Sequence, residues 1–82
     1  MDNQLEKTFN NAISKSSLED LDSLWALLKY QDIGILRKMK AICKILKIDF
    51  EQISEFLPKN DQGWILDRPT RHLVHDILIK YS

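Results

Sequence analysis

Hydrophobic and polar positions alternate along most of the chain with the three- and four-residue period of amphipathic helices. From this period we expect helices over about residues 3–14, 18–28, 35–48, 50–57 and 68–81. The second of these is the most apolar. Its expected buried stripe consists of Leu18, Leu21, Trp25 and Leu28, widened by Leu24 and Leu27. The pattern predicts that Trp25 belongs to the core.

Local signals place the ends of the expected helices. Ser17 and Asp49 are suited to cap the second and fourth helices, because a short oxygen-bearing side chain can accept a hydrogen bond from a first-turn backbone N–H. Pro58 disfavours helical geometry at the residue before it and should end the fourth helix. Asp67 and Pro69 have the N-cap and first-turn character expected at the start of the last helix.

The connectors favour one compact helical domain. The short segment YQDIG, over residues 30–34, should make the second and third helices antiparallel neighbours. The segment KNDQG, over residues 59–63, has turn composition, and Trp64 then begins either a brief extended segment or a plug against the helices. The sequence therefore predicts an all-α fold, with residues 1–82 forming a small single domain of about five short helices in an orthogonal or bundle-like arrangement.

Composition narrows the class of protein. The 82 residues are 44% hydrophobic and 29% charged, with a formal net charge of zero, so a folded chain without a global field for nucleic acid or anionic lipid is expected. The polar N-terminal stretch, the lone cysteine and the lack of a long apolar run predict an intracellular protein, cytoplasmic or nuclear, with no membrane contact. Whether the chain forms a homo-oligomer is left open.

Catalytic and metal-binding patterns are weak. The sequence has no Gly-rich phosphate loop and no nucleophile elbow. The helical phase of Cys43 places its thiol on the apolar side, which favours a buried structural role. His72 and His75, three residues apart, share a helix face, but zinc requires three or four ligands. We therefore expect no enzymatic activity, no metal and no cofactor.

The first functional hypothesis is a non-enzymatic protein–protein interaction module, such as a regulator, inhibitor, adaptor or assembly factor. Its candidate contact residues are Trp64, Arg68, His72, His75 and Ile79. Tryptophan and arginine are favoured at the energetic centres of protein interfaces. Another protein is accordingly the favoured partner.

The second hypothesis is a small nucleic-acid-binding or transcription-regulating domain that uses the basic helix 36–47 (LRKMKAICKILK). On a helical wheel its cationic side falls in one sector about 80° wide. That sector contains Arg37, Lys40, Lys44 and Lys47. The opposing expectation is that Glu19 and Asp22, near the start of the preceding helix, pair with this sector and neutralise it.

The fragments MKAICKILKI and RHLVHDIL resemble the two helices of SAP-type DNA-binding modules. The resemblance covers barely a quarter of the chain and implies a DNA-binding function. It departs from the module between the fragments, where Phe50 to Arg68 form an extra helix and a long loop in place of a tight turn. No site residue is transferred from that family.

Overall fold

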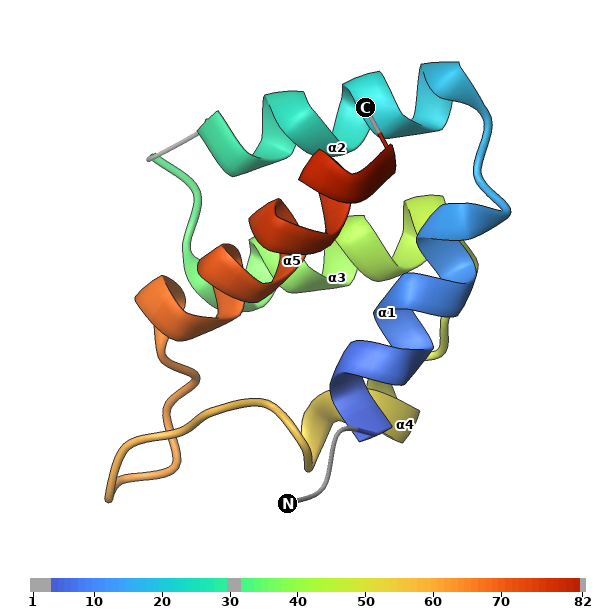
Figure 1. Cartoon of the computed structure of the whole chain (residues 1–82). Coiled ribbons are helices and arrows are strands. Elements are labelled where there is room, and N and C mark those ends of the chain that lie inside the picture. Colours follow the sequence, from blue (N-terminus) through green and yellow to red (C-terminus); the bar gives the residue numbers. More distant parts are fainter. Residues whose placement is uncertain (1–3, 30–31, 82) are drawn as a thin grey trace.

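The computed structural model describes residues 4–29 and 32–81, and the described part of the chain contains five helices and no β-strand. These are α1 (Gln4–Ser14), α2 (Leu18–Lys29), α3 (Ile35–Leu46), α4 (Phe50–Ser54) and α5 (Asp67–Tyr81) (Figure 1). The all-α prediction is confirmed. The expected helix start at residue 3 and part of the connector over residues 30–34 lie outside the described residues.

The last helix, α5, packs against two other helices of the fold. Helix α5 packs against both α1 and α2, while α2 also packs on α3, and α3 on α4. Figure 1 shows α2 and α3 running in opposite directions, with α5 crossing between α2 and α1. The Tyr81 hydroxyl donates a hydrogen bond of 3.1 Å to Asn10 Oδ1, which joins the end of α5 to α1. Segments from both ends of the chain therefore enclose one core.

All four longer helices contribute large apolar side chains to this core. Its fully covered members include Phe9, Ile13, Leu24, Met39, Ile42, Val74, Ile77 and Leu78. Burying a side chain of this kind contributes roughly 1.5–3 kcal/mol. None of the described helices is both long and apolar enough to cross a membrane.

The predicted caps of two helices are present. The Asp20 backbone N–H donates to Ser17 Oγ at 3.2 Å, and the Glu51 N–H donates to Asp49 Oδ1 at 3.1 Å. Helix α4 is shorter than expected, because it ends at Ser54 and the chain continues through turns before Pro58. Helix α5 begins at Asp67, so this residue occupies the first turn and not the predicted N-cap.

The buried stripe of α2 differs from the predicted one. Leu21, Leu24 and Leu28 are buried, whereas Leu18 is 78% exposed. Trp25 packs against the core but is only partly buried, so its predicted assignment to the core is correct only in part. The physical reason is that α2 is contacted by both α3 and α5, and their positions select which side of this broadly apolar helix is covered.

The segment before α5 forms a small turn that points a tryptophan outward. The Leu66 N–H donates to Pro58 O at 2.8 Å, and an isolated antiparallel bridge pairs Lys59 with Ile65. At the tip, the Trp64 N–H donates to Asn60 Oδ1 at 3.0 Å. The extended alternative is therefore the correct one. Ile65 packs against the core, but the Trp64 residue is 69% exposed.

Candidate functional site

Four of the five predicted protein-contact residues lie on one outer side of α5. Arg68, His72, His75 and Ile79 are all exposed. Because they recur at intervals of four, three and four residues, they fall within a sector about 60° wide. We call this set the α5 strip. Trp64 lies in the preceding turn and is exposed as well, but it does not line the pocket beside the strip.

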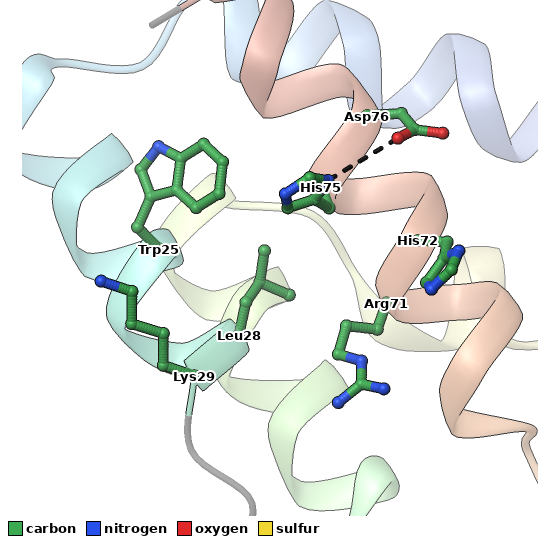
Figure 2. A pocket seen from close by; sticks show the side chains of 7 residues that line it. All are labelled: Trp25, Leu28, Lys29, Arg71, His72, His75 and Asp76. Carbon is green, nitrogen blue, oxygen red and sulfur yellow. Dashed lines mark ion pairs between the residues drawn. The ribbon is translucent and has the colours of Figure 1, made fainter.

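A pocket of about 530 Å³ opens between α2 and α5 beside this strip. Its lining residues are Trp25, Leu28 and Lys29 from α2 and Arg71, His72, His75 and Asp76 from α5. Figure 2 shows Trp25 and Leu28 of α2 on the side toward His75 and Arg71 of α5, whereas the Lys29 side chain extends away from α5. We call it the α2–α5 pocket. Its volume lies within the usual range of about 300–1,000 Å³ for ligand sites.

The wall of the pocket is aromatic and apolar. The rings of Trp25 and His75 meet edge to face, with centroids 5.2 Å apart and planes at 90°. Such edge-to-face contacts are favoured because the positive edge of one ring meets the negative face of the other. Leu28 is buried below them and belongs to the core cluster. The half-covered indole is thus held against the core while part of its surface remains accessible.

Charged groups border this wall from both helices. Arg71 Nη1 lies 4.0 Å from Asp67 Oδ2, a long contact one helical turn apart. His75 Nδ1 lies 3.7 Å from Asp76 Oδ1, and in Figure 2 this carboxylate lies on the far side of His75 from Trp25. Within the described residues, the Lys29 ammonium has neither an ion pair nor a hydrogen bond. The charged residues of the lining are therefore two cations, Lys29 and Arg71, and one carboxylate, Asp76.

Sequence reasoning missed most of the pocket. It identified His72 and His75, but it did not include Arg71 among the candidate contact residues and it placed Trp25 in the core. One signal was available on α2, where Trp25 and Lys29 are four residues apart and so share a helix side. Nothing in the sequence placed that side against α5, because the two helices are far apart in the chain.

The predicted basic stripe of α3 is fully accessible. Its members Arg37, Lys40, Lys44 and Lys47 are all exposed. The expected neutralisation by Glu19 and Asp22 is absent, since no ion pair in the described ranges joins either carboxylate to the stripe. The buried side of α3 includes Met39, Ile42 and Leu46, and this orientation turns the stripe to solvent.

A second, more polar groove lies at the C-terminal end of this stripe. It has a volume of about 560 Å³ and lies between α1 and the segment from Leu46 to Gln52. Lys7 of α1 and Lys15, directly after α1, line it together with Lys47, and Asp49 is the acidic member of the lining. Lys47 has φ 61° at the end of α3, a left-handed conformation that normally favours glycine. Helix α1 and the residue after it thus add two cations that the sequence hypothesis did not include.

The other residues considered for catalysis or metal binding were Cys43 and the histidines of α5. The Cys43 thiol is buried, and burial together with the nearby Asp49 charge raises its pKa from 9.0 to about 11. A thiol in this state is a poor nucleophile at neutral pH. Among the described residues, no three histidine, cysteine or acidic side chains are grouped so that they could hold a metal ion.

No protein-family model, curated protein or solved structure matches this chain. The resemblance of residues 39–48 and 71–78 to SAP-type modules therefore gains no support from a family match. In the structure, α4 and the turn at residues 58–66 separate these two fragments. Function must accordingly be argued from the surfaces themselves.

Proposed function

We propose that this chain is a non-enzymatic protein-interaction module whose docking surface is the α2–α5 pocket with the adjoining α5 strip. The observation that carries the proposal is the accessible indole of Trp25, which is held against His75 beside Arg71. Tryptophan and arginine at the mouth of a pocket are the residue types that most often supply binding energy in protein interfaces.

The fold explains why such a surface can be rigid in a small domain. Leu28 and Val74 are buried on the two helices that form the pocket, so the same core contacts fix the distance between its walls. A preformed site loses less conformational entropy on binding than a flexible one. Ile79 extends the apolar surface along α5 and is 53% exposed.

Peptide display can test this proposal without knowledge of the natural partner. A random peptide library would be selected on the wild-type domain, and the enriched peptides would then be measured against Trp25→Ala and Trp64→Ala. Trp64 is the matched control because it is exposed and lies outside the pocket lining. Truncating an interface tryptophan typically costs about 2 kcal/mol or more, a roughly thirtyfold loss of affinity.

The expected result is binding that Trp25→Ala abolishes or strongly weakens and that Trp64→Ala leaves within about twofold. Circular dichroism of each variant would confirm that it is folded. If no enriched peptide distinguishes Trp25→Ala from the wild type, the α2–α5 pocket is not the docking surface. Dependence on Trp64 alone would move the interface to the turn at residues 58–66.

Nucleic-acid binding through α3 is the second candidate function. It is favoured by one observation, the exposure of the whole α3 stripe without ion pairs among the described residues. Lys7 and Lys15 beside Lys47 would enlarge the cationic surface to six side chains. Each phosphate contact in duplex DNA contributes about −0.9 to the slope of log affinity against log salt concentration.

This candidate is tested by titrating the domain with duplex DNA and single-stranded RNA at two salt concentrations. Lys44→Gln removes a central cation, and Lys47→Gly removes another while placing glycine at a left-handed backbone position. Lys29→Gln, on α2, is the control. Salt-sensitive binding that weakens in both stripe variants but not in the control is expected. Absence of binding at about 50 mM salt would reject the candidate, because electrostatic binding is strongest there.

A further inference from the structure

We propose that the α2–α5 pocket recognises an acidic peptide segment in which an apolar anchor of one or two residues is flanked by carboxylates. This inference rests on the proposed function, since it specifies the partner of the same pocket. The inference follows from three features of the pocket. Its apolar floor is the surface of Trp25 and Leu28, and its two rims carry the cations Lys29 and Arg71. The third feature is the direction of the nearby carboxylates.

The floor provides space for an apolar side chain. Trp25 contributes an indole that is only partly covered by the core, and Leu28 lies beneath it. His75 meets the indole edge to face and so restricts its rotation. Burying an aliphatic or aromatic side chain on this floor would remove its apolar surface from water, which is the main driving force of such contacts.

The rims provide cations on opposite sides of that floor. Lys29 lines the pocket from α2 with its ammonium directed away from α5, while Arg71 leans from α5 toward α2 (Figure 2). Among the described residues, the one charge contact of Arg71 is the 4.0 Å approach of Nη1 to Asp67 Oδ2, which leaves most of its five N–H donors available for another carboxylate. A planar guanidinium pairs with carboxylates in a bidentate geometry that lysine does not offer.

Acidic groups near the pocket do not neutralise both rims. Asp67 contacts Arg71 from the first turn of α5, and Asp76 lies beyond His75, away from Trp25. No carboxylate of the described residues lies within ion-pair distance of Lys29. His72 and His75 also line the pocket, and an imidazole carries no negative charge.

The separation of the two cations favours an internal acidic segment over a free C-terminus. Lys29 and Arg71 belong to different helices and flank the apolar floor. A partner's terminal carboxylate can pair with one of them, whereas acidic residues on both sides of an apolar residue can pair with both. Charge complementarity thus selects a segment with carboxylates before and after its apolar anchor.

The probe is a capped hexapeptide, acetylated and amidated, with a central Phe-Leu pair between two glutamates on each side. A second peptide replaces the glutamates by glutamine, and a third replaces the Phe-Leu pair by two glycines. The protein carries Trp64→Phe, so that Trp25 is the only indole and its emission reports on the pocket. Binding constants come from this emission and, for Trp25 variants, from anisotropy of a labelled peptide.

The acidic peptide should bind about tenfold or more tightly than either altered peptide, because each lacks one of the two required contacts. Arg71→Gln should weaken its binding about fivefold or more, since it removes a cation that is partly shielded from water. Lys44→Gln on α3 is the matched control for loss of one positive charge and should change binding less than about twofold. Asp76→Asn should leave binding unchanged or tighten it.

Equal affinity for the glutamate and glutamine peptides would overturn the inference, and so would equal effects of Arg71→Gln and Lys44→Gln. No binding of the acidic peptide at up to about 1 mM, where contacts worth only ~4 kcal/mol are still detected, would also overturn it. Binding of only an uncapped peptide with a free C-terminus would show a terminal carboxylate site in place of an internal one. Failure of this inference remains distinct from failure of the proposed function. If displayed neutral or basic peptides bind in a Trp25-dependent manner, the pocket is an interface with a different partner chemistry.

Discussion

The buried thiol of Cys43 gives a prediction whose size follows from the structure. The thiol is neutral when protonated, and its pKa rises from 9.0 to about 11 because burial, aided by the Asp49 charge, disfavours the thiolate. The folded state therefore binds this proton more tightly than the unfolded state. The contribution of the protonated Cys43 thiol to the free energy of unfolding is fully present below pH 9 and is lost as the pH rises toward 11.

The shift sets the magnitude of the effect. A difference of about two pKa units corresponds to roughly 3 kcal/mol between the protonated and fully ionised limits. At pH 10, halfway through this range, between about 1 and 2 kcal/mol should be lost. Lysines and tyrosines also titrate there, so the measurement must be made relative to a variant that differs only at Cys43.

The assay is urea unfolding followed by circular dichroism for the wild type and Cys43→Ala at pH 7.5, 9 and 10. The free energy of unfolding of the wild type should fall toward, or below, that of Cys43→Ala between pH 7.5 and 10 by about 1–2 kcal/mol. Other titrating groups are shared and cancel in the difference. A difference between the two proteins that stays constant from pH 7.5 to pH 10 would refute the assigned burial of the thiol.

Three further predictions concern stability and are checked by thermal or urea unfolding. Thr70→Val should leave the free energy of unfolding unchanged or raise it by up to about 1 kcal/mol, because Thr70 Oγ1 is buried without a hydrogen-bond partner among the described residues. A loss above about 1 kcal/mol would argue against this environment. Lys38→Met should raise the free energy of unfolding by about 1 kcal/mol, since Lys38 is 2% exposed. Lys40→Met, on the exposed side of α3, should change it by less than about 0.5 kcal/mol, and equal effects of the two variants would contradict the burial of Lys38. Leu24→Ala should lower the free energy of unfolding by about 2–5 kcal/mol, and Leu36→Ala, at a half-exposed position, should lower it by less than about 1 kcal/mol. The reverse order would show that the core is placed wrongly.

Several sequence signals that act within a few residues predicted the structure correctly, although the expected N-cap at Asp67 and the expected end of α4 at Pro58 were wrong. The Ser17 and Asp49 caps depend only on the backbone N–H groups two or three residues further along, and both hydrogen bonds are present. The helical phase of Cys43 likewise placed its side chain correctly in the core. These features need no knowledge of which helices come together.

Features that depend on helix rotation were not predictable in the same way. Helix α2 is apolar on more than one side, so periodicity alone could not decide between Leu18 and Leu24 as a buried residue. Contacts from α3 and α5 select Leu24 and leave Trp25 at the edge. The antiparallel pairing of α2 and α3 was expected, yet the rotation of α3 about its own axis decides whether Glu19 can reach the basic stripe.

The charge pattern of α3 is unfavourable for stability by itself. Arg37, Lys40, Lys44 and Lys47 follow one another at intervals of three or four residues, and like charges at this spacing repel by about 0.2–0.5 kcal/mol per pair. Lys47 adds a left-handed backbone conformation that glycine would adopt at lower cost. No ion pair within the described residues offsets these terms, so burial of Met39, Ile42 and Leu46 on the opposite side must do so. A chain with zero net charge can therefore still present six of its twelve basic residues as exposed side chains on α1 and α3 or directly after them, and the net value was a poor guide to the charge that a partner would meet.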